Sequence, residues 1–286
     1  MKNNENYKAA PGMEPVYKIN PTEVKDIHLS LGNSKIGNMI NWSTLPGNEE
    51  HMLIAKGRLI TDIVGTCSIN CQGCFKNCYA RKSVLKHHNS VACNWAENTI
   101  MIRDKKDECF QKIDEEIRKL NREFYEGRSP EPKYDIFRIN VSGEISDSEE
   151  LERWNNLAYL HPEIKFGTYT KNSTALIEFF KKNKDSAPNF TINVSEWHGV
   201  MKDTIETLHK IGSVFNVFEY DDSNRAKNDL SEDEKVRLSK LPHCVAVGPT
   251  AANRHPINPK TGKAWHCHEC KGCYTKTGTH RCVYSH

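Results

Sequence analysis

Residues 136–144 read Ile136-Phe-Arg-Ile-Asn-Val-Ser-Gly-Glu144, and the segment after them has the pattern of a helix. The first six residues are rich in β-branched and aromatic side chains, which favours a strand. Ser146 is expected to cap the helix, with Glu149 three residues later as the partner in a capping box. The apolar residues that follow at helical spacing predict the buried face: Leu151, Trp154, Leu157 and Leu160. The stretch therefore predicts one β/α unit.

The same alternation of strand and helix recurs along the middle of the chain. Six strands are expected, at residues 59–64, 136–141, 164–170, 190–195, 214–219 and 244–248. Strands that alternate with helices indicate parallel pairing through right-handed crossovers. Because six units are two fewer than a closed eight-fold barrel needs, we expect an α/β protein built on a partial (β/α)6 barrel. The predicted parts are an N-terminal extension at 1–50, the barrel core at 51–250 and a cysteine-rich segment at 251–286.

Composition excludes few classes of protein but bears on compartment and partners. The 286 residues carry 40 basic and 37 acidic side chains, so the net charge of +3 argues neither for nor against a polyanionic partner. No stretch approaches the roughly 18–20 apolar residues that cross a membrane, and the first residues lack the pattern of a signal peptide. We therefore expect a cytoplasmic protein with no membrane partner. In that compartment eleven cysteines indicate metal ligands rather than disulfides.

The first cysteine cluster follows the apolar run at 59–64. Its sequence, Cys67-Ser-Ile-Asn-Cys71-Gln-Gly-Cys74, spaces three thiols as Cys-x3-Cys-x2-Cys. Three thiolates satisfy three irons of a four-iron cluster and leave the fourth open, as a reactive metal centre requires. Cys78 leaves alternatives open. Either Cys71 or Cys78 is the spare thiol, Cys78 packs behind the loop, or all four hold zinc.

A second cysteine cluster lies near the end of the sequence. Cys267, Cys270 and Cys273 are separated by two residues each, and Cys282 follows. Four thiols suffice for a second closed cluster, and the spacing suits iron–sulfur or zinc. If Cys282 is not a ligand, the alternative fourth ligand is His280, His286 or a substrate. The isolated Cys109 and Cys244 are expected to be buried packing residues.

Polar motifs follow the expected strands at their carboxyl ends, where active sites of such folds gather. They are Ser142-Gly-Glu144, Tyr169-Thr-Lys171, Asn193-Val-Ser-Glu196 and Glu219-Tyr-Asp-Asp222. The cysteine loop and these motifs are therefore predicted to share one rim of the sheet.

With these motifs the chain resembles the radical S-adenosylmethionine superfamily. The three-cysteine loop after a strand is similar to that superfamily's cluster loop, and Gly143-Glu144 resembles its glycine-glutamate motif, with Ser142 in place of the usual first glycine. A narrower resemblance, over roughly residues 28–286, is to the phage gene product 88 family. It rests on Leu29-Ser-Leu-Gly-Asn-Ser-Lys35, Cys74-Phe-Lys-Asn-Cys78-Tyr-Ala, Ser142-Gly-Glu, Thr168-Tyr-Thr-Lys171 and the cysteine-rich tail.

The superfamily resemblance implies a chemistry and a set of roles. A 4Fe–4S cluster on the first loop would bind S-adenosylmethionine, and reductive cleavage would give a 5′-deoxyadenosyl radical that abstracts hydrogen from an unidentified substrate. An electron donor such as flavodoxin or ferredoxin would be a partner. The implied cofactor contacts are Ser142, Gly143 and Glu144 for the methionine part, Asn193 and Ser195 for the ribose, and Gly248 for the adenine. The competing hypothesis is a non-catalytic zinc-binding phage protein that acts as a nucleic-acid or protein interaction module.

Overall fold

The computed structural model describes residues 8–33, 37–55, 57–68, 72–75, 78–86, 88–197, 199–221, 223, 230–245, 247 and 256–284. Its main sheet has the strand order β10-β9-β8-β7-β6-β3-β2. The strands are β2 (Ser30–Asn33), β3 (Gly37–Asn41), β6 (Ile136–Arg138), β7 (Lys165–Thr170), β8 (Phe190–Glu196), β9 (Asn216–Asp221) and β10 (His280–Tyr284). From β3 to β10 all neighbours are parallel, and β2 runs antiparallel to β3. The mixed α/β class is therefore confirmed.

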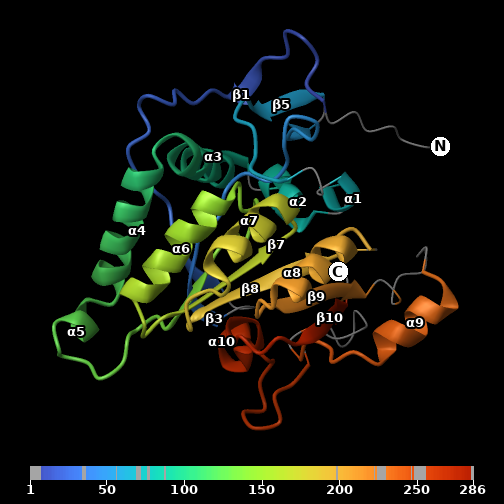
Figure 1. The fold of residues 1–286 in the computed structure, drawn as a ribbon. Coiled ribbons are helices and arrows are strands. Elements are labelled where there is room, and N and C mark those ends of the chain that lie inside the picture. Colours follow the sequence, from blue (N-terminus) through green and yellow to red (C-terminus); the bar gives the residue numbers. More distant parts are fainter. Residues whose placement is uncertain are drawn as a thin grey trace.

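Helices lie between the strands in the chain and against the sheet in space. The longer ones are α2 (Tyr79–Lys86), α3 (His88–Asp104), α4 (Lys106–Leu120), α6 (Ser148–Leu160), α7 (Ser173–Asn183), α8 (Lys202–Ile211) and α9 (Glu232–Ser239). Short turns of helix are α1 (Gln72–Phe75), α5 (Arg122–Tyr125) and α10 (Cys267–Cys270). Figure 1 shows α6, α7 and α8 side by side over one face of the sheet. A second, small sheet has the order β1-β5-β4, from β1 (Pro15–Tyr17), β5 (Arg58–Thr61) and β4 (Ile54–Ala55).

The first strand of the parallel set is not the predicted one. Residues 59–64 were expected to hold that position, but β5 pairs with β1 and β4 in the small sheet. The position beside β6 belongs to β3, where Ile40 pairs with Phe137. This strand is hard to predict from the sequence, because its first two residues, Gly37 and Asn38, are typical of turns. The buried residues Met39 and Ile40 follow them.

The sixth strand also differs from the prediction. Residues 244–248 fall partly outside the described residues, and the position beside β9 belongs to β10, paired from His280↔Val217 to Tyr284↔Asp221. Only a single bridge, His243↔Cys282, extends the pairing beyond β10. Within the described residues β10 and β2 form the two edges, so the sheet is not a closed barrel. The sheet takes strands from both ends of the sequence, while the predicted division at residues 50 and 250 stays a prediction.

The cap of α6 lies one residue later than predicted. Asp147, not Ser146, is the N-cap, and its carboxylate accepts a hydrogen bond from the Glu150 backbone N–H at 2.7 Å. Glu150 in turn accepts from the Ser146 backbone N–H at 2.8 Å. The predicted capping box is therefore not formed, because Glu150 accepts from the residue before the cap and not from the cap itself.

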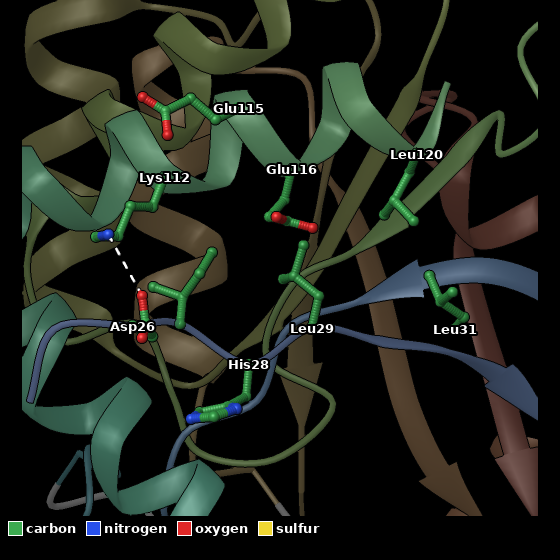
Figure 2. Close-up of a pocket in the computed structure, with 9 residues that line it drawn as sticks. Asp26, His28, Leu29, Leu31, Lys112, Glu115, Glu116 and Leu120 are labelled. Carbon is green, nitrogen blue, oxygen red and sulfur yellow. Dashed lines mark ion pairs between the residues drawn. The ribbon is translucent and has the colours of Figure 1, made fainter. Parts of the chain in front are cut away.

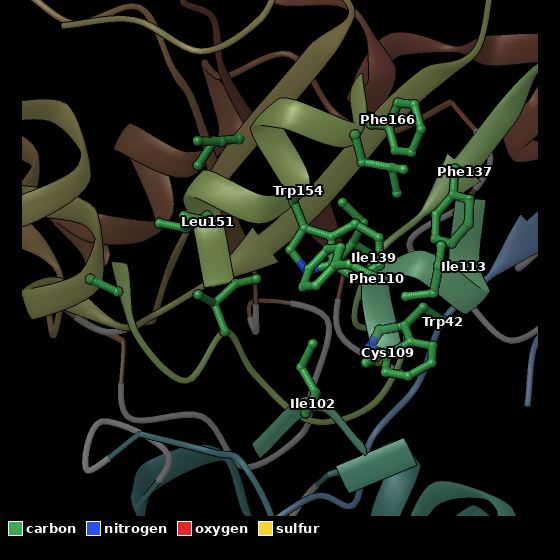
Figure 3. Close-up of a cluster of buried hydrophobic side chains, with 14 of the residues drawn as sticks. Trp42, Ile102, Cys109, Phe110, Ile113, Phe137, Ile139, Leu151, Trp154 and Phe166 are labelled. Carbon is green, nitrogen blue, oxygen red and sulfur yellow. The ribbon is translucent and has the colours of Figure 1, made fainter. Parts of the chain in front are cut away.

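Aromatic side chains fill the core between α6 and the sheet. The fully buried Trp154 ring lies edge-on to Phe110 at 4.8 Å and to Trp42 at 6.2 Å between ring centres. Phe137 of β6 packs at 5.4 Å from the same indole (Figure 3). Leu160 was predicted to be buried but is 61% exposed at the end of the helix. Trp154 thus joins α4, α6, β6 and the end of β3.

We expect Trp154→Ala to lower the free energy of unfolding by about 3–5 kcal/mol, because it leaves a large cavity and removes three ring contacts. Urea unfolding followed by circular dichroism measures the change. Tyr159→Ala on the same helix is the control, since Tyr159 is 60% exposed and should cost under about 0.5 kcal/mol. Equal losses in the two variants would contradict this account of the core.

Candidate functional site

The first cysteine loop joins the small sheet to α1 and α2. Cys67 accepts a hydrogen bond on its sulfur from the Gly47 backbone N–H at 3.1 Å. Cys74 lies on α1, Cys78 directly precedes α2, and all three are free thiols. Burial, with a smaller contribution from the charges of Cys67 and Cys78 and against the effect of Lys171, raises the pKa of Cys74 to about 11. These mutual effects show that the three thiols share one environment. Cys71 lies outside the described residues.

A lysine and a carboxylate share that environment. The charge of Lys171, directly after β7, lowers the pKa of Cys74, whereas that of Glu144 raises it. Burial would lower the pKa of the Lys171 ammonium, but Tyr220, Cys74 and Glu144 outweigh it and raise that pKa above its usual value. Lys171 is therefore a cation at neutral pH, placed to stabilise thiolates.

The loop after β6 is tied to two other strand-end loops. The Glu144 backbone N–H donates to the Thr66 hydroxyl at 2.8 Å, and that hydroxyl lies 2.8 Å from the hydroxyl of Thr44. The Thr44 backbone N–H donates to the Ser142 carbonyl at 3.0 Å. Between them Gly143 has φ +80°, and a Cβ there would lie 1.8 Å from the Thr44 hydroxyl oxygen. Only glycine fits this position.

The same loop fixes a buried carboxylate. Glu144 is 6% exposed, and its two oxygens accept from the backbone N–H groups of Ile145 at 3.0 Å and Lys171 at 2.8 Å. Burial raises the pKa of Glu144, while Lys171 and these hydrogen bonds oppose the rise. Ser142 is 2% exposed, and its hydroxyl has no hydrogen-bond partner. The Glu144 carboxylate is thus held in one orientation by backbone hydrogen bonds, whereas the Ser142 hydroxyl is buried without a partner.

The residues predicted to contact ribose and adenine are buried on β8 or lie outside the described chain. The Asn193 amide donates to the carbonyls of Thr168 at 2.9 Å and Cys273 at 3.0 Å. Asn193 therefore fastens the second cysteine segment to the sheet. Ser195, two residues along β8, is buried on the same face. Gly248 lies outside the described residues, and all three assignments stay predictions.

The second cysteine segment covers the sheet face that the helices leave open. Tyr274 packs against Gly167, where a Cβ would meet its ring at 2.5 Å. It also packs against Met39 and Ile136, with Cys267 and Cys273 at the margin of that cluster. Neighbouring strand residues Phe137 and Phe166 instead enter the helix-side core. Since successive side chains of a strand point to opposite faces, the tail lies opposite α6 and α7.

The thiols that gather here differ from the predicted set. Burial raises the pKa of Cys273 to about 12, and the neighbouring charges that add to it are those of Cys244, Cys267 and Cys270. Cys282 has different neighbours: it is fully buried on β10, and the charges that act on it are those of Glu219, Asp221 and Arg237.

Sequence reasoning missed Cys244 because no short spacing links it to the tail. Its backbone N–H donates to the Cys282 carbonyl at 2.8 Å, so the pairing of the last strand brings it there. Among the residues that the structure describes, no three His, Cys, Asp or Glu side chains are close enough to hold one metal ion. In a four-iron cluster each thiolate binds a different iron, so its ligands are spread more widely.

Two cavities are notable. One, of about 330 Å³, adjoins the first cysteine loop and is bounded by Cys67, Thr66, Ser146 and Asn172 among others. The other, of about 410 Å³, lies between α4 and the N-terminal segment, where Lys112 and Asp26 form an ion pair at 3.5 Å (Figure 2). No cysteine lines the second cavity, so only the first adjoins the site.

A sheet of consecutive parallel strands, with helices on one face and a cysteine-rich segment on the other, defines a sequential α/β protein with two groups of thiols. Residues 23–276 match the family described as Gene product 88, and the chain belongs to that family. The narrower resemblance seen in the sequence is thereby confirmed. No curated protein and no solved structure matches the chain. In the described part of the chain, no helix has the length and apolar character needed to cross a membrane.

Gly143→Ala should lower the free energy of unfolding by more than about 2 kcal/mol, because it combines a positive φ with a clash against Thr44. Chemical denaturation measures the loss. Gly127→Ala is a matched control, since Gly127 has φ +70° but open space around it, and should cost only about 1–2 kcal/mol. A Gly143 variant no less stable than the Gly127 variant would show that the close approach to Thr44 is unimportant.

Proposed function

We propose that this protein is a radical S-adenosylmethionine enzyme whose first cysteine loop holds a 4Fe–4S cluster. The observation that carries the proposal is that the thiols of Cys67, Cys74 and Cys78 share one electrostatic environment with Lys171 and Glu144. Cluster ligands, a cation and a fixed carboxylate meet where three strand-end loops are hydrogen-bonded together. The order of six parallel strands is what a partial (β/α)6 barrel of this class requires.

Each residue type suits a part of that chemistry. When bound, the cluster and S-adenosylmethionine supply a 5′-deoxyadenosyl radical that abstracts hydrogen from a substrate. The thiols of the loop hold the cluster, with Cys71 or Cys78 as the spare. Glu144, already oriented by two backbone N–H groups, accepts a charge-assisted hydrogen bond from the methionine ammonium. Lys171 offsets the negative charge of the thiolates.

A second metal centre is proposed for the tail, as a 4Fe–4S cluster or zinc. We assign its ligands to Cys244, Cys267, Cys270 and Cys273, because each of the other three thiols acts on the pKa of Cys273. The assignment replaces Cys282, whose neighbours are the charged side chains of Glu219, Asp221 and Arg237.

Anaerobically purified protein should be brown, contain iron and release 5′-deoxyadenosine from S-adenosylmethionine when reduced with dithionite. Cys67→Ala should reduce this release to background, because the first cluster loses a ligand. Cys93→Ala, at an isolated thiol on α3, is the control and should retain it. A colourless, air-stable protein with zinc in place of iron and no cofactor cleavage would instead support the interaction-module hypothesis.

The second centre is tested by metal content in two serine variants. Cys244→Ser should lose the metal of the tail, because one of four ligands is removed, while Cys282→Ser should keep it. Elemental analysis and the visible absorption of each purified variant give the result. Retained metal in Cys244→Ser with loss in Cys282→Ser would restore the assignment expected from the sequence.

A further inference from the structure

Three side chains at alternate positions along and beyond β6 carry buried polar atoms without partners. They are Arg138, Asn140 and Ser142, and the atoms are the guanidinium Nε, both amide atoms and the hydroxyl. Asn140 is only 6% exposed and Ser142 only 2%. An unsatisfied buried polar atom costs about 1–3 kcal/mol, so each such group in a native protein needs a reason. Three such side chains at alternate positions indicate that a polar ligand forms hydrogen bonds with them.

The backbone at Asn140 is also unusual. Its φ is +52°, one of three positive values among described non-glycine residues. The backbone N–H of Trp42 donates to the Arg138 carbonyl at 2.9 Å, and the Trp42 carbonyl accepts from the Val141 N–H at 3.0 Å. The segment after β6 therefore has one residue more between these two bonds than a regular parallel strand would have. Such bulges re-aim side chains and are frequent beside functional sites.

Arg138 carries the positive charge of this group. Its guanidinium lies 5.4 Å from the centre of the Tyr169 ring. The groups whose charges act on it most are Tyr274, Tyr79, Tyr169 and Cys267, and none is a carboxylate. No described acidic side chain forms an ion pair with Arg138.

Two buried carboxylates of the described chain do have such partners. Glu219 is paired with Arg237 and with His280 at 2.8 Å, and Asp221 with His243 at 2.8 Å. A charge removed from water without a partner is unfavourable, because it loses its hydration. The partly buried Arg138 has no such partner among the described acidic side chains.

Its neighbours place Arg138 between the two groups of thiols. Tyr79 follows Cys78 in the first cysteine loop, and its hydroxyl donates to the Val141 carbonyl. Cys267 belongs to the second group. Arg138 is on the same strand face as Ile136, which packs on Tyr274 of the tail.

We propose that Arg138, together with Asn140, binds an oxyanion of the substrate, a carboxylate or a phosphate, on the sheet face that the cysteine-rich tail covers. The proposal rests on the proposed function and gives its substrate a chemical class. A guanidinium presents two parallel N–H donors to a planar oxyanion, and the Asn140 amide supplies a third. The Tyr169 ring stacks with the guanidinium and limits its rotation. The oxyanion would accept from the two unpaired donors, the Arg138 Nε–H and the Asn140 amide N–H.

Anion titrations of the anaerobically purified full chain test this. The probes are inorganic phosphate and acetate, compared with chloride at equal ionic strength, and the readout is the shift in Tm with concentration. The wild type should show a saturable rise with one probe beyond that with chloride, and the preferred probe distinguishes a phosphoryl from a carboxylate group. Arg138→Gln should weaken the apparent affinity about 10- to 100-fold, because a charge-assisted contact is lost. Arg138→Lys keeps the positive charge but loses the pair of parallel N–H donors, so its apparent affinity should lie between those of the wild type and Arg138→Gln.

Two further variants sharpen the test. Asn140→Ala should weaken binding less than Arg138→Gln, and Arg153→Gln should leave it unchanged, since Arg153 is a half-exposed arginine paired on α6. An unaltered titration in Arg138→Gln, or no anion-specific shift in the wild type, would overturn the inference. So would loss of the tail's metal from Arg138→Gln without an anion response, because Arg138 would then serve the thiolates.

The inference and the proposed function fail separately. Release of 5′-deoxyadenosine by the wild type tests the proposed function alone, and the anion titration tests the inference alone. A wild type that binds the anion but never cleaves S-adenosylmethionine would reject the enzyme and keep the oxyanion site. Cleavage of S-adenosylmethionine without any response to the anions would keep the enzyme and reject the oxyanion site.

Discussion

The hydrogen bonds that join Thr44, Thr66 and the backbone of Glu144 are the contacts on which the site depends. Thr44 follows β3, Thr66 belongs to the loop after β5, and Glu144 follows β6, so three segments from different parts of the chain meet there. Thr66 is one residue before Cys67. The position of the first thiol relative to the Glu144 carboxylate is thus set by this short network. Gly143 permits it, because any side chain at that residue would occupy the place of the Thr44 hydroxyl.

The two faces of the sheet differ in character: one packs against the helices in the hydrophobic core, and the other carries the residues of the candidate site. On the helix side Phe137, Phe166 and Trp154 form a dry aromatic core of the kind that dominates folding energetics. The opposite face carries polar and ionisable side chains beside the small apolar cluster of Met39, Ile136 and Tyr274, and the cysteine-rich tail covers it. The Asn193 amide donates a hydrogen bond to the carbonyl of Cys273, so this face also anchors the tail. Burial beneath the tail strengthens every electrostatic interaction there.

Charge is distributed unevenly within this covered face. Lys171 has anionic and acidic groups around it, and the resulting rise in its pKa keeps it charged. Arg138 has tyrosines and a thiol instead, and it lies against the Tyr169 ring. This difference in surroundings underlies the two proposed roles, with Lys171 offsetting the charge of the thiolates and Arg138 binding an oxyanion. Both are held by rigid strands or strand ends, which suits a site that must be organised before binding.

The sequence by itself determined the α/β class, the membership of most strands and the identity of the glycine-glutamate loop, because local periodicity and turn chemistry encode these directly. It also predicted the burial of Cys109, which is 0% exposed in the core. The two outer parallel strands were predicted wrongly because β3 begins with the turn-forming residues Gly37 and Asn38, and β10 lies far along the chain from its partner β9. Only the tertiary structure decided that Cys244 joins the tail thiols while Cys282 faces Glu219, since strand pairing and alternation set the direction of each side chain. The tertiary structure likewise places no described carboxylate in an ion pair with Arg138. The spacing of residues in a sequence cannot predict that such a partner is absent.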